Sequence, residues 1–212
     1  MNILNYESEE NDLGKINLSG FSNIHIAKMK QQDTSLTKPT YEAAVPLRGG
    51  KSVSCELSFE SIQFYADNTI NFQDSYFSGG TMNLVVSGLT LDEYKLLFGN
   101  TVKKGGVMVN INDIAPELAV TFERKILGTN FVRKYVVYGV KFQPCSISAE
   151  TLAESINEEN VELTATIRSL ATGEIYSFID TNSDEYDASL DDWHTDIKFL
   201  DVESSIALKT SK

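Results

Sequence analysis

The side chains best suited to chemistry are two histidines and two cysteines, and their positions favour structural roles. His25 lies in a strand-like stretch, and His194 lies in an acidic stretch near the C-terminus. Neither histidine has a cysteine or a second histidine at the spacing of a zinc ligand set. Cys55 alternates with apolar residues, so we expect Cys55 and Cys145 to be free thiols buried in a core. The sequence therefore predicts no metal site.

A second candidate site resembles the start of a calcium-binding loop. Asp180, Asn182 and Asp184 match the opening D-x-[DN]-x-[DN] pattern. Glu185 follows where the loop needs glycine for its sharp turn, and Asp191 stands where a bidentate glutamate is expected. The sequence also lacks the motifs of serine nucleophiles, zinc proteases, phosphate-binding loops and dinucleotide folds. We therefore expect neither an enzyme nor a cofactor.

The charge of the chain argues against tight binding of nucleic acid. The formal net charge is −12, of which residues 150–212 carry −11 and residues 1–149 only −1. Binding of a phosphate backbone by counterion release needs surplus cations, and this chain has a surplus of acids. An acidic surface repels phosphates, which is compatible with a protein that surrounds DNA without holding it. Lys103 and Lys104 form a basic pair, either a solvated turn or a contact to an acidic patch on another subunit.

The elements that must position these residues are mainly strands of one domain. The chain has 212 residues, 42% hydrophobic and 23% charged, as in a globular protein with its own core. Apolar and polar residues alternate over Val53–Phe59, Leu118–Phe122 and Val161–Ile167, which predicts half-buried strands. Phe131–Phe142 is rich in Tyr and Val on both faces, which favours a strand covered on both sides or one that meets a partner. No apolar run reaches the roughly 20 residues of a membrane-spanning helix.

One short helix is predicted over about 90–98. Thr90 and Glu93 have the spacing of a capping box, in which each side chain bonds the other residue's free backbone N–H. Gly99 supplies the C-terminal stop, and the apolar residues before it form one stripe. We expect this helix of about two turns to lie on a sheet or to close the end of a barrel.

The two ends of the chain differ from its middle. Residues 1–19 are polar with scattered apolar residues, and residues 181–212 mix acids with large apolar side chains such as Trp193 and Phe199. Purely disordered tails lack such anchors, although chain ends are common sites of disorder. A flexible tail and an arm docked on a neighbouring subunit both fit. The expected division is an N-terminal arm (1–19), a central β domain (20–180) and an acidic C-terminal arm (181–212).

Three segments carry a resemblance to a known family. Gly20–Ala27 has the pattern G-x-x-x-x-x-x-A, residues 65–68 read Tyr-Ala-Asp-Asn, and the predicted helix ends Leu-Leu-Phe-Gly. Together they resemble the major tail protein (tail tube protein) family of long-tailed bacteriophages of Gram-positive hosts, over residues 20–180. The Tyr-Ala-Asp-Asn stretch is the most specific part, and Phe98 departs from the family's Leu-Leu-Gly ending.

This resemblance implies a mainly β fold, a sandwich or barrel of tail-tube type with one short helix and extended terminal arms. It implies a structural protein of the virion, assembled in the cytoplasm of the bacterial host, whose hexameric rings stack into a hollow tube. DNA passes through an acidic lumen during ejection without specific binding. The implied partners are further copies of the chain, the tape-measure protein and the tail terminator and initiator proteins, with no membrane.

Within such a tube, strand residues opposite a buried face point outward, and some of them face the lumen. The candidate lumen-facing acids are Glu56, Glu60, Asp67 and Asp74. The candidate residues at contacts between subunits are Tyr135, Val137, Lys103, Lys104, Trp193 and Phe199.

Two alternatives stay open at this point. The long ends are also compatible with a tail-like bacteriocin particle, contractile or non-contractile. A different class of function is a β-sandwich binding module for a receptor or a carbohydrate on a phage or bacterial surface particle. Against that module, Trp193 is the single tryptophan available as an aromatic platform, and it lies in the acidic C-terminal stretch.

Overall fold

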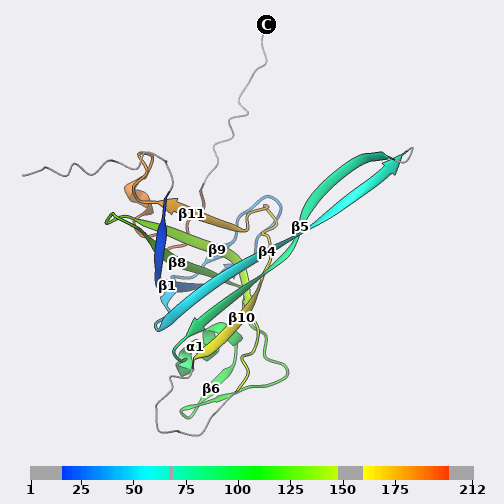
Figure 1. The fold of residues 1–212 in the computed structure, drawn as a ribbon. Helices are drawn as coiled ribbons and strands as arrows, with labels where there is room; N and C mark the ends of the chain where they lie inside the picture. The colour runs from blue at the N-terminus through cyan, green and yellow to red at the C-terminus, as the bar shows by residue number, and fades with distance from the viewer. Residues whose placement is uncertain (1–15, 67–68, 148–159, 201–212) are drawn as a thin grey trace, which may run out of the picture.

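The computed structural model describes residues 16–66, 69–147 and 160–200. Within these residues the fold is mainly β, with a large antiparallel sheet and one short α-helix, which confirms the predicted fold class (Figure 1). The elements are β1 (Leu18–Gln31), β2 (Thr40–Tyr41), β3 (Val45–Pro46), β4 (Gly50–Ala66), β5 (Thr69–Val86), α1 (Leu91–Phe98), β6 (Thr101–Lys103), β7 (Gly106–Met108), β8 (Leu118–Ile126), β9 (Val132–Phe142), β10 (Val161–Ile167), β11 (Tyr176–Asp180) and a 3-10 turn at Ala188–Leu190.

The main sheet has nine strands and curls back over itself. Its order is β2-β1-β8-β9-β10-β5-β4, with β3 added beside β1. β10 pairs with the C-terminal part of β9 and β11 with its N-terminal part, so both lie along the same strand. Because the sheet curls, the start of β4 lies close to β1. A β-carbon on Gly50 would lie only 2.0 Å from Ile24 Cδ1. That close approach explains the glycine at the start of β4.

The sheet has an apolar core on each face. The inner core lies between the β4–β5 hairpin and the strands β1, β8 and β9, and it includes Leu84, Val120 and Val137. The outer core lies where residues 186–199 cover the opposite face, and it includes Val136 and Tyr138. Successive residues of β9 thus enter opposite cores. The Tyr-rich strand is covered on both sides by its own chain, which decides between the two alternatives for this strand.

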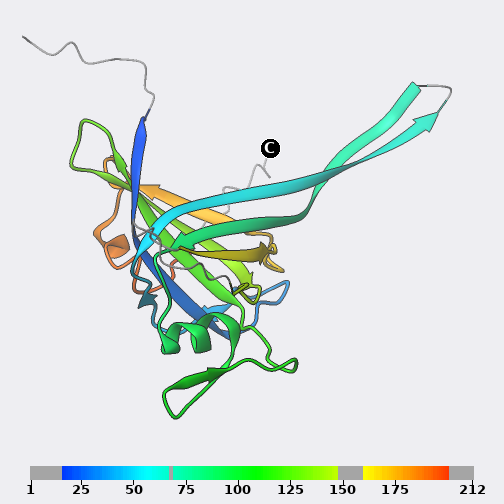
Figure 2. The same ribbon diagram turned by 60° about the horizontal axis from the view of Figure 1, so that its bottom comes forward.

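The helix forms as its capping residues predict. Glu93 N donates to Thr90 Oγ1 at 3.4 Å, and Thr90 N donates to Glu93 Oε2 at 2.6 Å, which completes the capping box. Gly99 has φ 71°, in the left-handed region, and its N–H bonds Lys95 O at the helix end. α1 buries Leu97 and Phe98 in the inner core, so it closes one end of the curled sheet (Figure 2).

The C-terminal stretch corrects one prediction, because residues 181–200 pack on their own domain. Trp193 has an exposed fraction of 0% and lies in the outer core, so it is closed to contacts with a neighbouring subunit. Lys134 Nζ donates to the carbonyl oxygens of Leu190 and Asp191 at 3.4 and 3.2 Å, which ties the 3-10 turn to β9. The apolar anchors read from the sequence therefore find their pockets on the sheet of the same chain.

A buried histidine also fastens this segment. His194 lies 3.2 Å from Glu123 Oε2 through Nε2 and 3.0 Å from Thr121 Oγ1 through Nδ1. A carboxylate only accepts, so Nε2 carries the proton and Nδ1 accepts from the threonine hydroxyl. His25 stacks on the ring at 5.7 Å between centroids. Burial lowers the pKa of His194 to about 4, against the attraction of Glu123, so the neutral form is favoured.

Three further expectations need correction. Cys55 lies on the inner side of β4 as predicted but is exposed, because the core beneath it is open there; Cys145 is half-buried, and both are free thiols. Val137 is buried in the inner core and is closed to a partner. The proposed N-terminal arm overlaps β1, since Leu18 and Ser19 already pair with β8. Residues 1–15 of that arm and residues 201–212 of the C-terminal arm lie outside the described residues.

Candidate functional site

The first candidate surface is the outer part of the β4–β5 hairpin, which extends far beyond the body of the protein (Figures 1 and 2). The strands pair from Gly50↔Val86 to Ala66↔Thr69. We call residues 59–66 and 69–77 the ribbon. β4 pairs with β5 on one side, and its other edge pairs with no strand among the described residues. An unpaired edge of this length is a ready site for contact with another chain.

The two faces of the ribbon differ in chemistry. Side chains alternate along β4, and Val53, Cys55 and Leu57 line the inner side, so the even-numbered residues from Glu56 to Phe64 point outward. The register places large apolar residues and acids together on this outer face. It carries Glu60, Ile62, Phe64, Phe72, Asp74 and Tyr76.

The outer-face apolar side chains of the ribbon are exposed. Phe64 and Phe72 face one another across the strands at 5.8 Å between ring centroids, with exposed fractions of 60% and 49%. The Tyr76 hydroxyl donates to Glu60 Oε2 at 2.8 Å. The opposite face carries no charged side chain, and Gln63 pairs there with Gln73 and Ser61 with Ser75. The same face also carries exposed aromatic residues, with Phe59 at 59% beside Phe77 and Tyr65 at 67%. The acids of the ribbon therefore lie on its outer face, whereas exposed aromatic side chains lie on both faces.

Two of the four candidate lumen residues, Glu60 and Asp74, lie on this ribbon, and Glu56 precedes it on β4. Glu56, Glu60 and Asp74 are exposed, and the alternation puts all three on the outward-facing side of the hairpin. Asp67 lies outside the described residues. Sequence reasoning found the acids but missed the exposed Ile62, Phe64 and Phe72 between them, because a period-two pattern does not tell a core face from a face that meets a partner.

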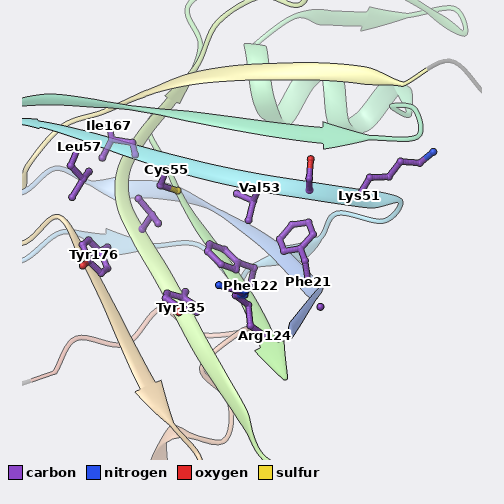
Figure 3. Close-up of a pocket in the computed structure, with 13 residues that line it drawn as sticks. Phe21, Lys51, Val53, Cys55, Leu57, Phe122, Arg124, Tyr135, Ile167 and Tyr176 are labelled. Carbon is purple, nitrogen blue, oxygen red and sulfur yellow. The ribbon is translucent and has the colours of Figure 1, made fainter. Parts of the chain in front are cut away.

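The second candidate surface is a groove of about 530 Å³ beneath β4 (Figure 3). Val53, Cys55 and Leu57 of β4 form its roof. Phe122 and Tyr135 form its floor, stacked at 4.9 Å between ring centroids on β8 and β9. We call this the aromatic groove.

The aromatic floor continues across four neighbouring strands. Phe21 of β1 meets the edge of Phe122 at 5.6 Å, and Phe178 of β11 lies 5.7 Å from Tyr135. Arg124 and Lys51 border the groove, where Arg124 Nη2 donates to Leu18 O at 3.3 Å and the Lys51 side chain points away from the rings (Figure 3). The groove thus combines an apolar floor with the positive charge of Arg124 at its border.

Arg133 lies beside the groove and packs on the Phe178 ring. Its guanidinium lies 4.5 Å from the Phe178 ring centre and bonds both carboxylate oxygens of Asp180, at 2.6 and 2.7 Å. Asp180 began the calcium-like pattern of the sequence, and its carboxylate is used here in an ion pair. No group of three or more His, Cys, Asp or Glu residues in the described ranges is placed to hold a metal ion.

A third exposed surface lies after α1. Lys103 and Lys104 are both exposed at the β6–β7 turn, as a contact or a solvated turn requires. The following loop exposes apolar side chains, with Ile111 at 97% and Ile114 at 77%. In the sequence, this loop could be recognised by Val109 and Ile111, which alternate with Asn110 and Asn112 as in a strand.

The structure thus divides the predicted contact residues. Lys103 and Lys104 are open to solvent, and Tyr135 is half-buried in the floor of the aromatic groove. Phe199 is half-buried and stacks on Tyr138 at 4.6 Å between ring centroids, within its own chain. Val137 is 4% exposed and lies in the lining of the aromatic groove, whereas Trp193 is fully buried in the outer core.

Comparison with known proteins adds little to this geometry. No protein-family model and no curated protein matches the chain. Among solved structures, the chain is similar to a cryo-EM structure of the anti-feeding prophage cap, described as its tube terminating cap, at 13% identity and a TM-score of 0.43. The match covers 74% of this chain and 87% of the other. A likeness at this level identifies neither fold family nor function. Among the described residues, no helix is long and apolar enough to cross a membrane.

Proposed function

We propose that this protein is the subunit of a phage tail tube, in which hexameric rings stack into a hollow conduit for DNA. The observation that supports this most is the ribbon. A two-stranded hairpin is marginally stable by itself in water, yet this one extends past the body (Figure 2). Its outer face carries exposed apolar side chains. Contact with a neighbouring copy would cover that face and pair the free edge of β4.

The charge pattern fits the same function. Glu56, Glu60 and Asp74 share the outward side of the hairpin, and a ring would repeat each of them around its circumference. Circles of like negative charge repel phosphates, so DNA would slide past them with little adsorption. The wider assembly would include tape-measure, terminator and initiator proteins at the ends of the tube.

Contact between unlike surfaces is what such a tube needs. Ring closure requires that one patch of a subunit meet a different patch of the next, because like-to-like contacts stop at a dimer. The ribbon, the aromatic groove and the exposed loop at Ile111 are three different surfaces on one chain.

The test compares the two faces of the ribbon. In Phe64→Ser/Phe72→Ser, the outer face loses its aromatic pair; in the matched control Gln63→Ser/Gln73→Ser, a polar pair changes on the opposite face of the same strands. Sedimentation velocity of the concentrated proteins should show large assemblies for the wild type and the control, and monomers for the Phe variant. Circular dichroism and thermal melting establish that the wild-type protein and both variants are folded. Equal assembly by both variants would refute the role of the ribbon.

A further inference from the structure

The loop that follows β7 presents a group of apolar side chains to solvent, at the same end of the protein as α1 (Figure 2). Val109, exposed at 63%, adds to Ile111 and Ile114, which are exposed still further. Single exposed apolar residues are ordinary on a folded protein, but a contiguous group of them marks a contact with another molecule. We call residues 109–115 the apolar loop.

Hydrogen bonds fix the shape of the apolar loop. The Asp113 carboxylate accepts from Asn110 N and from Asn100 Nδ2, each at 2.8 Å, and Asn100 is buried. Asp113 N donates in turn to Asn110 O at 3.0 Å. Gly99 also lies against the loop, since a β-carbon there would collide with Ile114 O. A loop already held in one shape loses little conformational entropy when it binds, so its exposed side chains are suited to a partner.

Three lysines border the apolar loop. Two grooves, of about 670 and 300 Å³, share Ile114 and Lys141 in their linings. The larger groove follows the apolar loop, and the smaller one adds Lys28 and Lys30 of β1. All three lysines are exposed. Within the residues that the structure describes, none of the three forms an ion pair.

The carboxylates of the same surface are occupied by groups of their own chain. Both oxygens of Glu117 accept from Arg168, at 3.1 and 2.6 Å, and the same guanidinium binds Asp33. Asp113 is taken up by the hydrogen bonds of the loop. A partner therefore meets exposed ammonium groups beside apolar side chains, on a chain whose net charge is −12. This combination favours a partner with carboxylates beside apolar residues, because complementary charge around an apolar contact speeds encounter and rejects partners of like charge.

The chain itself also combines exposed acids with exposed apolar side chains, on the outer face of the ribbon. The proposed function assigns Glu60 and Asp74 of that face to the lumen, so they are not the partners of these lysines. The partner that fits the apolar loop is then a different protein.

We propose that the apolar loop, with Lys28, Lys30 and Lys141 beside it, binds an acidic amphipathic segment of a second protein. Ile111 and Ile114 contact the apolar side chains of that segment, and the lysines pair with its carboxylates. The inference rests on the proposed function in one respect, that the acids of the ribbon face the lumen.

The test uses the full chain and a short fluorescein-labelled peptide in which Leu recurs at helical spacing and Glu fills the other positions. Fluorescence anisotropy measures its binding. Ile111→Ser should weaken binding by about tenfold, because an apolar side chain is lost from a buried contact. Lys141→Gln should weaken it by about twofold to fivefold, and added salt should act in the same direction through screening.

Matched controls change the same kinds of side chain at the other end of β8. Lys125 is exposed and lies seven residues along the strand from Leu118, which pairs with Lys28. Leu127, in the following turn, is 54% exposed. Lys125→Gln and Leu127→Ser should leave the affinity unchanged. A peptide with Gln in place of Glu should bind the wild-type protein at least about fivefold more weakly, because the charge complementarity is lost.

Several results would overturn the proposal. These are no binding of the Glu–Leu peptide, or equal weakening by Ile111→Ser and Leu127→Ser. Binding to vesicles of phosphatidylserine and phosphatidylcholine without binding to the peptide would assign the surface to lipid instead. Loss of self-association by Ile111→Ser in sedimentation velocity, with an unchanged circular dichroism spectrum, would assign it to a contact between copies. Rings that form while the peptide fails to bind would overturn this inference alone and leave the tube subunit standing.

Discussion

Replacement of Trp193 by alanine tests whether the C-terminal segment belongs to the folded domain. The side chain is fully buried among Ala27, Ala119, Val136 and Tyr138. Removing a buried aromatic side chain costs about 3–5 kcal/mol of unfolding free energy. The indole Nε1 has no hydrogen-bond partner among the described residues, and an unpaired buried donor already costs about 1–3 kcal/mol. Its removal offsets part of the loss, which places the net effect near 3 kcal/mol.

For a domain of this length, about 3 kcal/mol corresponds to a fall in melting temperature of roughly 6–12 °C. Trp193→Phe keeps a ring and drops the unpaired N–H, so its fall should be much smaller. Leu200→Ala, at a side chain 41% exposed, is the surface control and should change the free energy by under about 0.5 kcal/mol. Thermal melts of the free subunit decide the matter. An unchanged melting temperature for Trp193→Ala would refute the packing and restore the idea of an arm docked on a neighbour.

Three other perturbations have clear expected results. Burial lowers the pKa of His194 to about 4, below its unfolded value of about 6.5, so on acidification the unfolded chain takes up the proton first. The free energy of unfolding should therefore be constant above about pH 6.5 and fall by about 1–3 kcal/mol as the pH drops toward 4. Urea titrations of His194→Gln should show a smaller fall over that window. Thr90→Ala removes half of the capping box and should cost about 1 kcal/mol in the same assay, while an unchanged midpoint would exclude the cap as a contributor. Glu56→Lys/Glu60→Lys should leave tails assembled but slow DNA ejection, with salt relieving the delay through screening; wild-type ejection rates would exclude these two acids from the lumen.

The sequence predicts the local elements of this fold well and the long-range contacts poorly. Thr90, Glu93 and Gly99 specify the helix because each bonds within a few residues of itself. The fate of Trp193 depends on Val136 of β9, more than fifty residues away, and no local pattern encodes that contact. An apolar anchor among acids looks the same in sequence whether its pocket lies on its own sheet or on a neighbour.

The candidate surfaces divide in the same way. Alternation along β4 predicted a strand with one apolar face, and Val53 and Leu57 do face the inner core. Past Phe59 the apolar positions change from odd to even numbers, at Ile62 and Phe64, where the strand leaves the body and its side chains become exposed. The groove needs Phe21, Phe122 and Tyr135 from three strands, and only the register of β1, β8 and β9 brings these rings together.

Negative-stain electron microscopy of the concentrated protein tests the central claim most directly. A tail tube subunit whose ribbon contacts the next copy should form rings of uniform diameter with a stain-filled centre, and stacks of such rings as concentration rises. The Phe64→Ser/Phe72→Ser variant at the same concentration should show single small particles. Uniform monomers of the wild-type protein across the accessible concentrations would contradict the account and favour the β-sandwich binding module instead.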